Sequence, residues 1–156
     1  MMMRPATPED ADFLRGLFSD VRGADLVSVE PVQRRTLLAI QWRGRETQYA
    51  AAYPRAVDHI IEAEGRPAGR ILVDETADDV HVVDIAVAAD ARGRGLGGAA
   101  LRAWCDRADE SGRTLSLTVA PGNPARRLYE RLGLEAVAED QTAVRMRRQP
   151  KEDIRA

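Results

Sequence analysis

Apolar residues at helical spacing indicate that the N-terminal third of the chain is helical. A first helix is predicted to begin at Pro8, because Thr7 is a good helix cap and Asp10 suits the first turn. Its apolar stripe consists of Phe13, Leu14, Leu17, Phe18 and Val21. A second helix is predicted over residues 32–52, ended by Pro54, with a polar connection over residues 20–31 between the two helices.

Beyond residue 56, short apolar runs separated by turn residues predict strands. These runs cover residues 57–63, 68–73, 80–88, 114–119, 134–138 and 142–147, the last two forming a hairpin. Two more helices are predicted, one after the glycine-rich stretch 92–98 and one after Asn123 and Pro124. From residue 57 the order is β-β-β-α-β-α-β-β, which predicts a single α/β domain over residues 1–148 and a polar tail over 149–156.

Composition narrows the possible functions. The 156 residues carry a net charge of −2, so there is no excess of cations for a nucleic acid, although Lys151 is the only lysine and the other 22 basic residues are arginine. Cys105 is the only cysteine and there are two histidines, so we expect no internal disulfide and no metal site. With no apolar run near the roughly 20 residues of a membrane span and no signal peptide, we expect a cytoplasmic protein without a membrane partner.

The glycine-rich stretch after the strand 80–88 is suited to binding phosphate. Gly93, Gly95 and Gly97 remove side chains from the turn, and the start of the following helix presents free backbone N–H groups to an anion. Arg92 and Arg94 add positive charge. We therefore expect this stretch to bind a pyrophosphate group.

A dinucleotide site is an alternative, because Gly93, Gly95 and Gly98 satisfy G-x-G-x-x-G. Several residues separate this loop from its strand, however, and the next strand ends without an acidic residue for a ribose hydroxyl. Both features argue against the hypothesis of a dinucleotide-binding site.

Two stretches carry a resemblance to a known family. Arg92-x-x-Gly95-x-Gly97, after the strand segment 84–87, resembles the cofactor signature of the GNAT superfamily of acyl-CoA-dependent N-acyltransferases. The stretch from Asn123 to Leu134 resembles the second conserved segment of that family. The similarity is weak over residues 20–56, where the family's acceptor-binding region varies.

The resemblance implies an N-acetyltransferase that transfers the acetyl group of acetyl-CoA directly to a primary amine. It implies a mixed sheet whose two parallel strands, 82–88 and 114–119, splay apart around the co-substrate. It also implies that acetyl-CoA is bound by Ile85, Ala86, Val87, Arg92, Gly93, Arg94, Gly95, Leu96, Gly97, Gly98 and Asn123. The acceptor, a small-molecule or protein amine, is not identified, and a homodimer through the last strands stays open.

Two residues are candidates for the proton transfers. Tyr129 occupies the family's tyrosine position and is the expected acid for the CoA sulfur, although its spacing also fits an apolar helix face. Asp84 is the candidate base for the amine, directly or through water. The alternative for Asp84 is an ion pair with an arginine on an adjacent strand.

Other polar and aromatic residues are expected to be structural. His59 and His81 lie in strand segments, and Cys105 lies on a buried helix stripe. Trp42 and Tyr49 either line an acceptor pocket or pack the second helix, and we favour packing. Two other classes of function remain, a non-catalytic acyl-CoA-binding module and a nucleic-acid or protein interaction domain.

Overall fold

Seven strands form one mixed sheet in the order β1-β2-β3-β4-β5-β7-β6. The computed structural model describes residues 1–22, 26 and 28–151. All neighbouring strands are antiparallel except β4 and β5, which are parallel and joined through helix α3. The strands are β1 (Met2–Pro5), β2 (Val57–Ala63), β3 (Arg66–Glu75), β4 (Asp79–Val87), β5 (Thr114–Val119), β6 (Glu135–Glu139) and β7 (Val144–Arg148).

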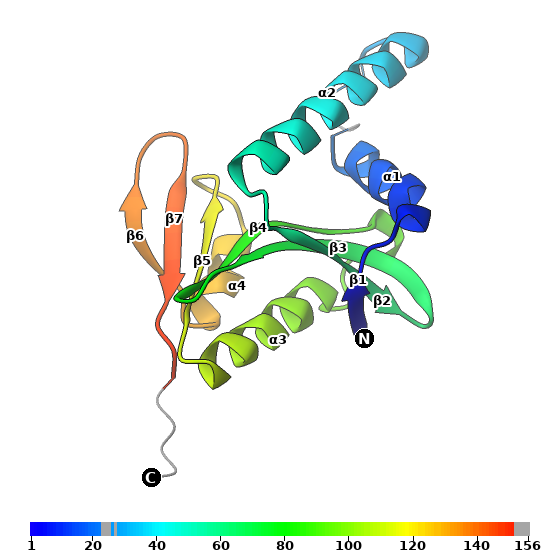
Figure 1. Ribbon diagram of the computed structural model, residues 1–156. Coiled ribbons are helices and arrows are strands. Elements are labelled where there is room, and N and C mark those ends of the chain that lie inside the picture. Colours follow the sequence, from blue (N-terminus) through cyan, green and yellow to red (C-terminus); the bar gives the residue numbers. More distant parts are fainter. Residues whose placement is uncertain (23–25, 27, 152–156) are drawn as a thin grey trace.

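Four helices cover the two faces of the sheet, as Figure 1 shows. On one side lie α1 (Ala11–Arg22) and α2 (Pro31–Ala52), with α2 approaching the sheet only near its C-terminal end. On the other side lie α3 (Leu96–Glu110) and α4 (Ala125–Arg131). Two 3-10 turns, Pro8–Asp10 and Ala89–Ala91, precede α1 and the glycine-rich loop.

The main core lies between α3, α4 and the sheet. Leu101 and Trp104 of α3 pack against strand residues such as Ile71, Val80 and Leu115. Helix α3 follows β4 because the chain must cross over the sheet before it can form the parallel strand β5. The apolar stripe of α3 packs against the sheet along this crossover. A smaller cluster holds α1 against the ends of β3 and β4 through Leu17, Ala68, Ala88 and Ala91.

The parallel strands β4 and β5 separate part-way along their length. Their pairing runs from Asp79 opposite Thr114 to Val82 opposite Leu117 and stops there. At the same level the β3–β4 register shifts, because Leu72 faces Asp84 while Val73 faces Val82, so that Val83 is an extra residue in β4. Beyond this bulge no described strand pairs with the β4 edge that would face β5.

The predicted fold class is confirmed, and most predicted elements lie where the sequence placed them. The prediction was wrong at the N-terminus, where Met2–Pro5 forms a strand paired with β2. The predicted cap is confirmed, since Thr7 is the N-cap residue ahead of Pro8, and its N–H donates to the Asp10 carboxylate at 2.8 Å. The predicted connection 20–31 and tail 149–156 lie partly outside the described residues, at 23–25, 27 and 152–156.

Candidate active site

A cavity of about 370 Å³ opens where β4 and β5 separate. Its lining comes from five elements and the loop after β5. The lining residues are Arg22, Arg45, Tyr49, Val82, Val83, Asp84, Ile85, Leu117, Thr118, Val119, Ala120, Asn123 and Tyr129. Four residues expected at the site, Asp84, Ile85, Asn123 and Tyr129, therefore share one cavity.

Tyr129 lies on α4 and is 8% exposed. Its ring packs in the main core, as helical spacing suggests, but its residue also lines the cavity. Burial raises the pKa of Tyr129, and the negative charge of Asp84 raises it further. Among the described residues its hydroxyl has no hydrogen-bond partner. The group is thus held protonated in a cavity where it can donate to a bound molecule.

Asp84 is surrounded by arginines. Its Oδ2 atom contacts Nη2 of Arg45 on α2 and lies 3.6 Å from Nη1 of Arg70 on β3. Arg70 is buried and also pairs with Asp58, whose Oδ1 lies 2.5 Å from its Nε. The ion pair with an adjacent strand, which the sequence left open, is therefore present, and a second arginine from a helix joins it.

The backbone of β4 presents polar groups to the cavity side. The N–H of Ala88 donates to Ala68 O of β3 at 2.7 Å. Because backbone groups alternate between the two edges of a strand, Ala86 also faces β3, whereas Ile85 and Val87 face the edge that lacks a strand. The Nε of Arg92 donates to the Val87 carbonyl at 3.1 Å, which confirms that this carbonyl points away from β3.

The glycine-rich loop joins the end of β4 to the N-terminus of α3. Gly93 and Gly95 have φ of 80° and 74°, a left-handed conformation that favours glycine. The first helical hydrogen bond runs from Ala99 N–H to Gly95 O at 3.0 Å, so the N–H groups of residues 96–98 have no partner within the helix. A side chain at Gly97 would meet Val87 and Ile85, which places this helix start beside the free edge of β4.

The outer residues of the loop are exposed. The Arg94 guanidinium lies 3.9 Å from the Glu64 carboxylate, a surface pair that water weakens. Asn123 is exposed as well, and its Oδ1 accepts from the Ala125 N–H at 2.9 Å, so it caps α4 as predicted while lining the cavity. Neither Arg94 nor the loop glycines line the cavity itself.

The sequence comparison identifies the family. The sequence model of the acetyltransferase (GNAT) family matches residues 25–134, which is more than half of the chain. The chain belongs to the GNAT acetyltransferase family. No curated protein sequence matches it.

Solved structures share the GNAT fold of this chain. The PaiA N-acetyltransferase from Thermoplasma acidophilum in complex with coenzyme A has 12% identity and a TM-score of 0.72, covering 95% of this chain and 98% of that one. The ribosomal-protein-S18-alanine N-acetyltransferase from Escherichia coli has 19% identity and a TM-score of 0.67, covering 99% and 97%. An acetyltransferase from Thermus thermophilus has 22% identity and a TM-score of 0.67, covering 96% and 97%.

The fold of this GNAT domain argues against the alternative of a dinucleotide-binding site. A dinucleotide-binding fold needs several neighbouring parallel strands. Among the described strands only β4 and β5 are parallel. No described helix is long and apolar enough to span a membrane.

The sequence did not predict Arg22 and Arg45, the two arginines that line the cavity between β4 and β5. Nothing in the sequence separates them from the other arginines of the chain. Tyr49 was expected to pack but lines the cavity, where its hydroxyl accepts from Arg45 Nε at 3.0 Å. Trp42 does pack, with its ring centroid 5.6 Å from that of Phe18.

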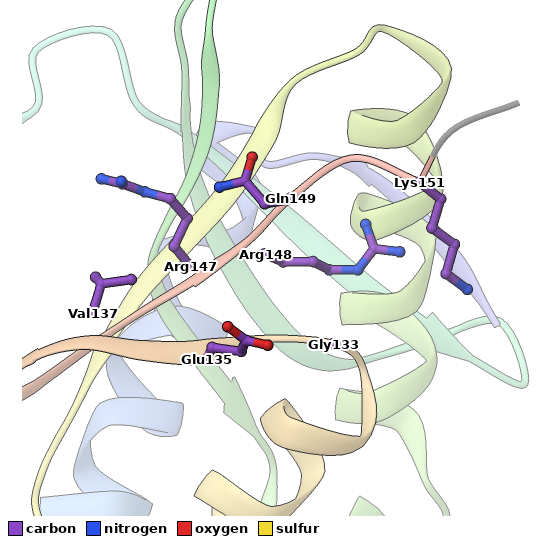
Figure 2. A pocket seen from close by; sticks show the side chains of 7 residues that line it. All are labelled: Gly133, Glu135, Val137, Arg147, Arg148, Gln149 and Lys151. Atoms are coloured by element: carbon purple, nitrogen blue, oxygen red, sulfur yellow. The ribbon is translucent and has the colours of Figure 1, made fainter.

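Other polar residues lie away from this cavity. His81 Nδ1 lies 2.8 Å from Ser116 Oγ, and the His59 ring packs edge-on against Trp104. Cys105 is buried in the main core, as predicted. A further cavity of about 320 Å³ lies beside β6 and β7 (Figure 2), and it shares no lining residue with the cavity between β4 and β5.

Proposed function

We propose that this protein is an N-acetyltransferase that moves the acetyl group of acetyl-CoA to a primary amine in a ternary complex. One observation carries the proposal. The unpaired edge of β4, the free N–H groups of the following helix and the hydroxyl of Tyr129 converge on one region of the molecule.

The free edge of β4 supports binding of the pantetheine arm. Backbone groups of Ile85 and Val87 would pair with this extended, amide-containing chain as a further strand does. The N–H groups of residues 96–98 and the side chains of Arg92 and Arg94 would hold the pyrophosphate. Asn123 would contact the co-substrate near the pantetheine.

The reaction joins two substrates without a covalent enzyme intermediate. The amine nitrogen attacks the thioester carbonyl carbon, and a C–N bond forms. A backbone N–H of Ile85 or Val87 stabilises the oxyanion of the tetrahedral intermediate. The C–S bond then breaks, and Tyr129 donates its proton to the leaving sulfur. Holding both substrates together supplies a large part of the rate enhancement.

Asp84 is proposed to take the proton from the arriving ammonium group, directly or through water. Its contact with Arg45 and Arg70 supports a second role, in which the carboxylate fixes those two side chains. Replacing Asp84 by Asn separates the roles. If Asp84 acts only as the base, the activity lost in the variant returns at higher pH, where the free amine is abundant. If Asp84 also fixes the two arginines, the variant has a lower unfolding temperature at every pH.

The test is turnover with a panel of primary amines. Release of the CoA thiol together with an acetylated amine product supports the proposal. Binding of acetyl-CoA without acetylation of any amine would instead identify a non-catalytic acyl-CoA-binding module. Acyl-CoA donors of increasing chain length, compared in the same assay, establish whether acetyl is the preferred group.

A further inference from the structure

The cavity at Asp84 continues into a groove between α1 and α2. This groove has a volume of about 380 Å³ and shares Arg22, Arg45 and Tyr49 with the cavity between β4 and β5. Its other lining residues are Phe18, Gln41, Gly44 and Gln48. A molecule that approaches Asp84 and Tyr129 along this groove therefore passes the two arginines and the two glutamines that line it.

Several contacts hold Arg45 at the junction of groove and cavity. Its Nε donates to the Tyr49 hydroxyl, and its guanidinium carbon lies 5.4 Å from the centre of the Phe18 ring and 5.1 Å from that of Tyr49. Its Nη2 contacts Asp84. The remaining N–H groups of the guanidinium are free to bind a second acceptor, because five donors are available in all.

Arg22 is an uncompensated cation at the same junction. Its side chain is exposed at the end of α1, and within the described residues no carboxylate pairs with it. Asp84 is the only carboxylate among the residues that line the cavity and the groove, and it already contacts Arg45 and Arg70. The approach to the reacting atoms thus has excess positive charge.

This charge distribution selects among amines. An oligoamine needs unpaired carboxylates for its additional ammonium groups, and the lining offers none. An amine that also has a carboxylate complements the site, because a guanidinium binds a carboxylate through two parallel hydrogen bonds. Asp84 and Arg45 are in direct contact, so the site offers a negative and a positive partner side by side.

We propose that the acceptor is a small amine with a carboxylate beside its amino group, as in an α-amino acid. Its carboxylate binds Arg22 and Arg45, its ammonium group faces Asp84, and Gln41 and Gln48 face the rest of the molecule. This inference rests on the acetyltransferase function proposed above. It adds the chemical class of the acceptor.

The test compares matched pairs of amines that differ only in the carboxylate, such as tyrosine with tyramine and tryptophan with tryptamine. For the wild-type protein we expect kcat/KM to favour the carboxylated member by about tenfold or more. In Arg22→Gln this ratio falls towards one, and in Arg22→Lys part of it returns. The matched control is Arg43→Gln on α2, which removes the same charge outside the cavity and the groove and keeps the wild-type ratio. A wild-type preference for the decarboxylated amines overturns the inference.

Binding of products separates this inference from the proposed function, because it needs no turnover. In the presence of CoA, N-acetyltyrosine is expected to bind the wild-type protein about tenfold more tightly than N-acetyltyramine, and Arg22→Gln removes the difference. Equal binding of the two products overturns the carboxylate site, even where amines are acetylated. A clear preference for N-acetyltyrosine without any acetylation supports the carboxylate site and contradicts the acetyltransferase function.

Discussion

Tyr129 and Asp84 line the same cavity but differ in their surroundings. Tyr129 is enclosed by apolar neighbours, and its hydroxyl has no hydrogen-bond partner among the described residues. Asp84 is in contact with two arginines. An isolated, protonated hydroxyl suits the proton donor that we propose, whereas a carboxylate held by guanidinium groups suits recognition of an ammonium group.

Replacing Tyr129 by Phe is expected to lower kcat by about a hundredfold while leaving the KM for acetyl-CoA nearly unchanged, because the lost hydroxyl acts on the leaving sulfur. Since burial raises the pKa of Tyr129 above its ordinary value of 10.0, the wild-type kcat should not decline through loss of this proton below that pH. Steady-state kinetics over a pH series measures both effects.

Tyr53→Phe is the matched control, since Tyr53 stacks on His81 and does not line the cavity. Equal kcat values for Tyr129→Phe and the wild-type protein would remove Tyr129 from the chemistry.

At the scale of elements, the end of β7 is joined to α3 by one buried ion pair. Arg148 is 5% exposed, and its two Nη atoms lie 2.6 and 3.0 Å from the two carboxylate oxygens of Asp109. Its Nε donates to the Leu132 carbonyl after α4 at 2.7 Å. In Figure 2 the Arg148 side chain points towards α3, whereas Arg147 points the opposite way. Arg148 thereby connects three elements that enclose the main core.

Replacing Arg148 by Met is expected to destabilise the protein by about 2 kcal/mol, because Asp109 and the Leu132 carbonyl lose their partner. Arg147→Met is the matched control on the exposed face of the same strand, and a change within about 0.5 kcal/mol is expected there. Chemical denaturation measures both free energies of unfolding. Equal effects of the two substitutions would contradict the role of the ion pair.

The sequence predicted the helices and the strands from residue 57 on, because their apolar residues recur at clear intervals. It missed β1, since Met2–Pro5 is too short to show alternation and pairs with a strand more than 50 residues away. It named Asp84, Ile85, Asn123 and Tyr129, which share the cavity. It missed Arg22 and Arg45 because only the packing of α1 and α2 distinguishes them from the other arginines.

For the whole molecule, the two partly buried histidines make stability depend on pH. Burial lowers the pKa of both His59 and His81 below the ordinary value of 6.5. The unfolded chain therefore binds protons first as the pH falls below 6.5, and the free energy of unfolding decreases. A second decrease starts at lower pH, because hydrogen bonds from Arg4 and Arg148 lower the pKa of Asp10 and Asp109 below 3.8.

Urea denaturation between about pH 8 and pH 5 measures the first of these effects. We expect a plateau above about pH 7 and a decline below 6.5, with a smaller decline in His81→Gln. Unchanged stability down to pH 5 would show that neither histidine is kept neutral by the fold.

In the proposed function, the free edge of β4 and the start of α3 bind acyl-CoA. Thermal unfolding with saturating acetyl-CoA, beside NAD and ATP, tests it most directly. A ligand at about 100 times its Kd adds about 2.7 kcal/mol, which raises Tm by several degrees for a domain of this size. If β4 and α3 bind acyl-CoA as proposed, this rise occurs with acetyl-CoA and not with NAD or ATP. A rise with NAD and none with acetyl-CoA would contradict it.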